Sequence, residues 1–90
     1  MAADPTLIEF YGTECFHCNE MKPLIQRLEQ ELGKELTKFE VWHNQANLKK
    51  LQEFDKGRCG GVPFFFNTKT GKFICGSTPY EKLKAWALGQ

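Results

Sequence analysis

The sequence lacks a strong excess of charge of either sign. Its 12 basic and 11 acidic residues are interspersed along the chain and leave a net charge of +1. Proteins that attract nucleic acid or anionic lipid by electrostatics do so through clustered basic residues, and this charge balance gives no basis for either partner. We therefore expect no nucleic acid and no membrane among the partners of this protein.

Long hydrophobic runs are also missing. The longest apolar stretch is far shorter than the roughly 20 residues that a membrane-spanning helix needs. No repeat, linker or low-complexity segment divides the chain, and its first residues, Met1 to Pro5, have neither the basic nor the apolar region of a secretory signal. We expect a cytoplasmic protein in which residues 1–90 form a single domain with a modest hydrophobic core.

The four cysteines are unevenly placed along the chain. Two of them belong to the segment Cys15-Phe16-His17-Cys18, whereas Cys59 and Cys75 stand alone. Four cysteines in a short chain can indicate a secreted disulfide scaffold, but the hydrophobic pattern here does not need such staples. We interpret Cys59 and Cys75 as passive thiols in a reducing compartment, with a regulatory thiol at Cys59 as the alternative.

Hydrophobic periodicity predicts an α/β fold with the element order βαβαββα and a mixed sheet. The expected strands are Thr6–Tyr11, Thr37–His43, Val62–Phe66 and Lys72–Cys75. The first helix is expected from Asn19 or earlier to about Leu32, and the other two are expected to start near Asn44 and Thr78. Pro23 should kink the first helix because it lacks an N–H donor. Either Asn44 or Asn47 should cap the second helix, and Thr78 should cap the third.

The Cys-x-x-Cys segment follows an apolar strand and a Gly12-Thr13 turn, and it precedes the first helix. Cys15 should therefore lie at the helix N-terminus, where free backbone N–H groups and the helix dipole stabilise an anion such as a thiolate. The i, i+3 spacing places Cys18 on the same face of the helix, within disulfide reach of Cys15. Placement and spacing together indicate a redox-active dithiol.

This combination of motifs resembles the thioredoxin superfamily over nearly the whole chain. The resemblance implies a compact form of that fold, a four-stranded mixed sheet with three helices packed on both faces. It also implies that Cys15 is the attacking cysteine, that Cys18 is the resolving cysteine, and that Glu9 is a buried acid assisting proton transfer. Pro63, which follows Val62, matches the cis-proline that the family places beside the two sulfur atoms.

The resemblance further implies a substrate-binding groove. Val62 and Pro63 would offer their backbone to an extended substrate as a short added strand. Gly76 matches the glycine beside that groove, and Phe16 and His17, between the cysteines, would line it. Superfamily members with a histidine before the second cysteine are the more oxidising ones. We therefore expect a reduction potential less negative than the roughly −270 mV typical of thioredoxin.

Two residues depart from the family pattern. Glu14 replaces the tryptophan that usually precedes the first cysteine, and its carboxylate should oppose a Cys15 thiolate and repel anionic glutathione. Glu40 stands about where thioredoxins carry the lysine that pairs with the buried acid. We therefore expect Glu9 to lack that lysine partner.

We predict a thiol–disulfide oxidoreductase that exchanges its Cys15/Cys18 pair with protein disulfides through a mixed-disulfide intermediate, and so serves in electron transport. A reductase or glutathione would donate the electrons, no cofactor or metal is needed, and the protein would be a monomer. One alternative is a glutathione-dependent, glutaredoxin-like reductase. The other is a non-catalytic module that binds zinc or an iron–sulfur cluster. Zinc would take its further ligands from Cys59, Cys75, His17 or His43.

Overall fold

The computed structural model describes residues 2–90 and contains four strands and three helices in the predicted order. The elements are β1 (Ala3–Tyr11), α1 (Phe16–Leu32), β2 (Glu35–Glu40), α2 (Gln45–Asp55), β3 (Phe64–Asn67), β4 (Phe73–Cys75) and α3 (Tyr80–Ala87). The strands form one sheet in the order β2-β1-β3-β4, in which β1 and β2 are parallel and the other neighbours are antiparallel. The predicted mixed α/β fold is confirmed.

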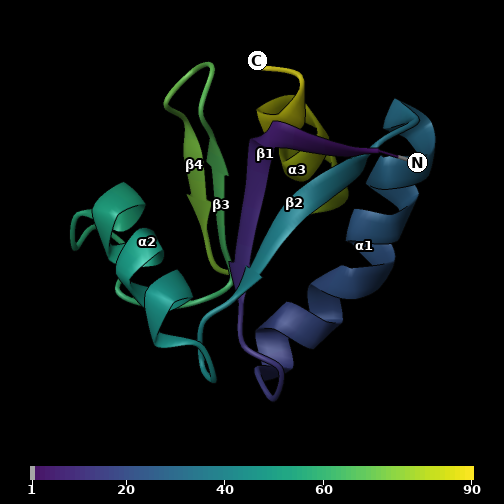
Figure 1. Ribbon diagram of the computed structural model, residues 1–90. Coiled ribbons are helices and arrows are strands. Elements are labelled where there is room, and N and C mark those ends of the chain that lie inside the picture. The colour runs from purple at the N-terminus through teal and green to yellow at the C-terminus, as the bar shows by residue number, and fades with distance from the viewer. Residues whose placement is uncertain (1) are drawn as a thin grey trace.

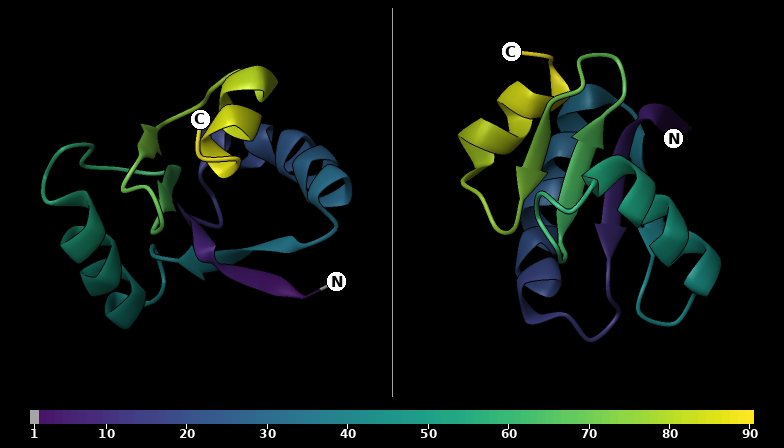
Figure 2. Two further views of the ribbon diagram at one scale, coloured as in Figure 1. Left: turned by 90° about the horizontal axis from the view of Figure 1, so that it is seen from above. Right: turned by 90° about the vertical axis from the view of Figure 1, so that its left-hand side faces the viewer.

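The helices cover both faces of this sheet. Helix α2 packs on one face, whereas α1 and α3 lie together on the other (Figures 1 and 2). The core between the sheet and α1 and α3 consists of Leu7, Met21, Ile25, Leu28, Leu36, Phe65, Leu83 and Trp86. The core beneath α2 consists of Ile8, Phe10, Val41, Leu51 and Phe64.

Alternation along the two central strands divides the core between these faces. Leu7 of β1 belongs to the core beneath α1 and α3, and the next residue, Ile8, belongs to the core beneath α2. Phe65 and Phe64 of β3 divide in the same way. Because side chains on one strand face share a period of two, Glu9 lies on the face of Leu7, where it is buried under α1.

Helix α1 has the predicted extent, with Cys15 at its N-terminus and Leu32 as its last residue. It continues through Pro23, because the proline removes one backbone hydrogen bond without ending the helix. Gly33 ends the helix with a φ of 72° and donates its N–H to the Glu29 carbonyl oxygen at 2.9 Å. None of the described helices combines the length and apolarity needed to cross a bilayer.

The other helix caps are mixed in outcome. The Asn44 side chain accepts a hydrogen bond from the Asn47 N–H at 3.0 Å, which confirms Asn44 as the cap of α2. The predicted cap of α3 is wrong, because Pro79 and not Thr78 occupies the N-cap position and no side chain caps that helix. Strand β2 was also predicted too late in the chain: it spans Glu35–Glu40, whereas the prediction was Thr37–His43.

Three connections meet at one end of the sheet. The loops that follow β1 and β2, together with the loop that leads into β3, lie at the end to which the β1 and β2 arrows point in Figure 1. Parallel strands present their carboxyl ends at the same edge of a sheet, which explains why the first two loops are neighbours. This end of the sheet carries the Cys-x-x-Cys segment.

Candidate active site

Cys15 occupies the N-cap position of α1. Its Sγ accepts a hydrogen bond from the Cys18 backbone N–H at 3.1 Å. The two sulfur atoms are joined in a disulfide, with the Cα atoms 5.2 Å apart, and both residues are buried. A backbone donor aimed at Sγ and the positive end of the helix dipole favour a negative charge on Cys15 once the bond is reduced. The geometry therefore suits Cys15 as the attacking thiolate.

The loop before β3 faces this pair. The Val62–Pro63 peptide bond is cis, and the Val62 carbonyl oxygen lies 3.8 Å from Cys15 Sγ. The Pro63 carbonyl oxygen accepts a hydrogen bond from the Gly76 N–H at 2.8 Å. Gly76 has a φ of 86°, which a residue with a side chain adopts only under strain. The structure thus brings Val62, Pro63 and Gly76 together beside Cys15.

Glu9 and Cys18 line a common cavity of about 280 Å³ between the sheet and α1. Burial raises the pKa of Glu9 to about 7, against the opposing effect of the Lys38 charge. A carboxyl group that titrates near neutral pH can either hold or accept a proton during thiol exchange. Glu9 is therefore a titratable carboxyl group in the cavity that Cys18 also lines.

Lys38 of β2, and not a residue at position 40, is the lysine whose charge acts on Glu9. The parallel register pairs Glu9 with Lys38, and Lys38 Nζ forms an ion pair with Glu29 Oε2 at 2.7 Å. The same Glu29 oxygen accepts a hydrogen bond from the Leu36 N–H at 2.9 Å. The sequence analysis assigned the lysine position to Glu40 because it started the second strand too late, and so it missed both Lys38 and Glu29.

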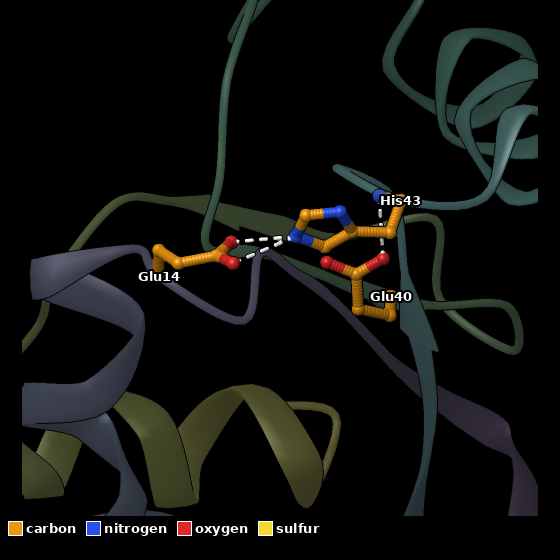
Figure 3. A group of neighbouring side chains, drawn as sticks. All are labelled: Glu14, Glu40 and His43. Atoms are coloured by element: carbon orange, nitrogen blue, oxygen red, sulfur yellow. Dashed lines mark hydrogen bonds and ion pairs between the residues drawn. The ribbon is translucent and has the colours of Figure 1, made fainter.

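Glu14 is not an isolated negative charge beside Cys15. Its carboxylate lies 2.7 Å from His43 Nε2, which comes from the loop between β2 and α2 (Figure 3). The hydrogen bond that the Glu14 carboxylate accepts from this nitrogen is the main cause of a raised pKa at His43. When it is protonated, this imidazole offsets the carboxylate that the sequence analysis expected to oppose the Cys15 thiolate.

Glu40 fixes the backbone around this ion pair. Its carboxylate accepts hydrogen bonds from the Thr13 N–H at 3.0 Å and the His43 N–H at 2.8 Å. Desolvation acts in the opposite direction, but these bonds lower the pKa of Glu40. Within residues 2–90, Glu14, Glu40 and His43 are the one group whose possible metal-ligating atoms all lie within 4.8 Å of one another. The hydrogen bonds already engage those atoms, and we assign them no metal.

The two residues between the cysteines point outward. Phe16 is 70% exposed, as expected for a residue at the rim of a binding groove. His17 Nδ1 contacts Glu20 Oε1 at 2.7 Å, so the histidine is directed towards that carboxylate. The Glu20 charge weakens any electrostatic effect of His17 on Cys15.

Cys59 and Cys75 form a second disulfide, which corrects their interpretation as separate passive thiols. Their Cα atoms lie 5.5 Å apart, and the bond links the loop before β3 to the last residue of β4. Cys75 is the register partner of Phe64, so the β3–β4 pairing brings it back towards that loop. No local sequence pattern predicts this bond, because the two residues lie 16 positions apart and approach only when the hairpin forms. The bond also occupies two thiols that the zinc alternative required.

A second hollow, which we call the Val62 groove, was not predicted. It has a volume of about 350 Å³. Its lining consists of Val41, Trp42, Leu48, Leu51, Gln52, Asp55, Gly57, Gly60, Gly61 and Val62. Trp42 is 52% exposed and packs so closely over Gly12 that a Cβ at this glycine would collide with the indole ring. An aromatic ring thus borders the Cys15 loop, although it comes from a different part of the sequence than the tryptophan that Glu14 replaces.

A cysteine pair at a helix N-terminus, facing a cis-proline at the edge of a mixed sheet, defines a thioredoxin-like dithiol protein. A family model described as Thioredoxin matches residues 1–87. The chain belongs to the thioredoxin family.

Individual relatives agree with this assignment. The chain is 38% identical over 76 residues to Thioredoxin X, chloroplastic, of Arabidopsis thaliana, covering 84% of this chain and 40% of that protein. It is 38% identical over 61 residues to the chloroplastic thioredoxin-like protein HCF164 of the same plant, covering 68% of this chain and 23% of that protein. It therefore spans less than half the length of these curated relatives. A glutaredoxin structure from Archaeoglobus fulgidus shares the fold, with a TM-score of 0.61 at 16% identity, over 92% of this chain and 86% of that one.

Proposed function

We propose that this protein is a thiol–disulfide oxidoreductase that exchanges electrons with disulfides of other proteins. The observation that carries the proposal is the position of Cys15 Sγ, which accepts the Cys18 N–H at the helix N-terminus and faces the cis Val62–Pro63 bond. Membership of the thioredoxin family supports the same chemistry. The contact of Glu14 with His43 also supports it, because a protonated His43 balances the negative charge of Glu14 next to Cys15.

The reaction proceeds by two thiol–disulfide exchanges. The Cys15 thiolate attacks one sulfur of the substrate disulfide, a mixed disulfide forms, and the other substrate sulfur leaves as a thiolate that takes up a proton. Cys18 then attacks the Cys15 sulfur, releases the second substrate thiol and closes the Cys15–Cys18 disulfide. Glu9 lines the same cavity as Cys18 and is the base for its proton. The substrate gains two electrons, which the dithiol loses, and the reverse sequence oxidises a substrate dithiol.

The substrate polypeptide would lie in an extended form along the loop that carries Pro63. The Val62 backbone offers hydrogen-bonding groups next to Cys15, as in strand addition. The Val62 groove would take an apolar side chain of the substrate, because Trp42 and Leu48 contribute exposed apolar surface to it. Phe16 stands exposed beside the reacting sulfur and would contact the same polypeptide.

The remaining proposals concern the cellular setting. We propose that residues 1–90 act as one monomeric domain that receives electrons from a protein reductase, without a cofactor and without nucleic acid or membrane partners. The cytoplasm is the location proposed from the sequence, whereas both plant relatives are named as chloroplastic. Glutathione is the competing electron donor, and the protonated form of His43 would offset the repulsion of glutathione by Glu14.

Trapping of the mixed disulfide tests the proposal. The Cys18→Ser variant should accumulate a covalent adduct with insulin, a disulfide-containing polypeptide, and the adduct should disappear on reduction. The Cys15→Ser/Cys18→Ser variant is the matched control and should form no adduct. An adduct that forms equally in this control would overturn the proposed role of Cys15.

A redox titration in glutathione buffers gives the second test. Alkylation and mass analysis of the Cys15–Cys18 peptide should show one two-electron transition, at a potential less negative than roughly −270 mV. Peptide-level readout is needed because Cys59 and Cys75 titrate in the same sample. If the pair shows no transition, the dithiol is not a redox couple, and the zinc or iron–sulfur alternative is then tested by metal analysis.

A further inference from the structure

The Cys59–Cys75 disulfide lies next to the substrate-binding loop rather than in a remote part of the fold. We propose that it is a second redox couple that controls this loop: the closed disulfide fixes the wall of the Val62 groove, and its reduction releases that wall. The inference rests on the proposed function, because the groove is expected to bind the substrate polypeptide.

The second disulfide is accessible to a reductant. Cys75 is exposed and Cys59 is half-buried, whereas Cys15 and Cys18 are both buried. Thiol–disulfide exchange requires that an attacking thiolate reach one sulfur of the bond along its axis. Exposure of Cys75 therefore makes this bond chemically reachable in the folded protein, and it singles out Cys75 as the sulfur that is attacked first.

The segment that the disulfide holds is short and rich in glycine. Cys59 is followed by Gly60, Gly61, Val62 and the cis-proline, and Gly60 has a φ of 76°. Glycines leave the backbone many accessible conformations. The conformation of this wall of the groove therefore depends on the hydrogen bonds and the disulfide that connect it to the rest of the fold.

Three attachments are visible. The buried Asp55 carboxylate accepts hydrogen bonds from the Cys59 N–H at 2.6 Å and the Gly60 N–H at 2.8 Å. The Gly76 N–H holds the Pro63 carbonyl oxygen at 2.8 Å. The disulfide is the covalent attachment, and Cys75 directly precedes Gly76. One bond therefore constrains both ends of the Cys59–Pro63 segment, through Cys59 at one end and through Gly76 at the other.

Reduction needs an external dithiol, either a small molecule or a protein. One thiolate of that dithiol attacks Cys75 Sγ, the Cys59–Cys75 bond breaks, and Cys59 leaves as a thiolate that takes a proton from water. The second thiol of the dithiol then displaces Cys75, which also becomes a thiol. Two electrons and two protons pass to the protein, and the dithiol becomes a disulfide. The expected consequence is weaker binding of extended substrates, with the reactivity of Cys15 itself unchanged.

Substrate size separates this role from a purely structural one. The Cys59→Ser/Cys75→Ser variant and the wild-type protein are compared as reductants of insulin and of hydroxyethyl disulfide, which is too small to occupy the groove. We expect the variant to raise KM for insulin by roughly three- to ten-fold and to leave kcat and the rate with hydroxyethyl disulfide within about two-fold of wild type. Equal KM values for insulin in the two proteins would overturn the inference. Absence of activity with both insulin and hydroxyethyl disulfide in the wild type would instead overturn the proposed function.

A second measurement does not depend on that variant or on catalysis. In the Cys15→Ser/Cys18→Ser protein the second couple is titrated alone, with mixtures of reduced and oxidised dithiothreitol and a readout of amide hydrogen exchange. The Gly60, Gly61 and Val62 amides should exchange at least about ten-fold faster after reduction, while amides in the centre of β1 keep their rates. If the disulfide resists reduction in the folded protein, or if the exchange rates of these loop amides do not change on reduction, Cys59–Cys75 has a structural role only.

Discussion

The two disulfides of this protein are the same kind of bond, but the hydrogen-bond donors and charges around their sulfur atoms differ. Around Cys15 a free backbone N–H, that of Cys18, points at the sulfur. Around Cys59 the free N–H groups of Cys59 and Gly60 point instead at the Asp55 carboxylate. The first arrangement stabilises a thiolate, and the second satisfies its donors with a carboxylate and places negative charge beside the sulfur. Backbone donors, and not the presence of a disulfide, thus distinguish the reactive pair from the constraining pair.

The two pairs also differ in what they can do with a proton. Cys18 shares a cavity with Glu9, whose pKa is raised to about 7. In the described part of the chain Asp55 is the carboxyl group hydrogen-bonded at Cys59, and it accepts two backbone hydrogen bonds there. A resolving cysteine needs a base when it attacks, whereas a disulfide that closes a loop needs none. The following experiments test this contrast.

Removal of the attacking sulfur should have the largest effect. Cys15→Ser should lower the rate of insulin reduction by about a thousand-fold or more, because Cys18, the thiol that remains in the pair, is buried. In the Cys59→Ser/Cys75→Ser protein, kcat should stay within about two-fold of wild type. Steady-state assays on both variants check the comparison. A thousand-fold loss of kcat in the second variant would place Cys59–Cys75 in the catalytic reaction.

The buried acid near the first pair should give the next largest effect. The pKa of Glu9 is raised from 4.5 to about 7, so the folded protein binds more protons than the unfolded chain between these pH values. The free energy of unfolding should therefore decrease as the pH rises from about 4.5 to 7, by up to about 3 kcal/mol. Glu9→Gln should remove this decrease, as measured by urea unfolding at several pH values. The exposed Glu53→Gln is a matched control and should keep the wild-type slope; equal slopes in all three proteins would contradict the burial of an ionisable Glu9.

Loop length predicts how much each disulfide stabilises the fold. In the chain-entropy model, the Cys59–Cys75 bond, with a separation of 16 residues, contributes about 3 kcal/mol, and the Cys15–Cys18 bond, with a separation of 3, contributes roughly 2 kcal/mol. Urea unfolding of the two double cysteine-to-serine variants at one pH measures the difference. A larger loss in Cys15→Ser/Cys18→Ser than in Cys59→Ser/Cys75→Ser would contradict the view that the second bond is the stronger constraint.

Local patterns were sufficient to predict most of this fold. The apolar run of Leu7, Ile8, Phe10 and Tyr11 and the turn before Cys15 are encoded in neighbouring residues, and the structure has the corresponding strand and helix. The Asn44 cap was likewise predictable because a cap involves residues three positions apart. The start of β2 was missed because its alternation is weak before Thr37.

The parts of the site that escaped prediction are contacts between distant segments. Lys38 reaches Glu9 only through the register of β1 with β2, and an error in the start of one strand moved that partnership to another residue. His43 and Glu14 lie 29 positions apart. The Cys59–Cys75 bond depends on the β3–β4 hairpin. In each case the residue types gave no signal about their partner, because the pairing is decided by the arrangement of whole strands.

The smallest expected effect concerns the charge balance beside the first pair. His43→Gln removes the cation that offsets Glu14, so the Glu14 carboxylate should then oppose the Cys15 thiolate. Because both side chains are exposed and screened, we expect alkylation of reduced Cys15 by iodoacetamide to slow by only about two-fold at low salt, and the difference to vanish near 1 M salt. Rates are read by mass for the Cys15 peptide. Glu14→Gln/His43→Gln should restore the wild-type rate; if this double variant is as slow as His43→Gln, the histidine acts through the loop backbone and not through the charge of Glu14.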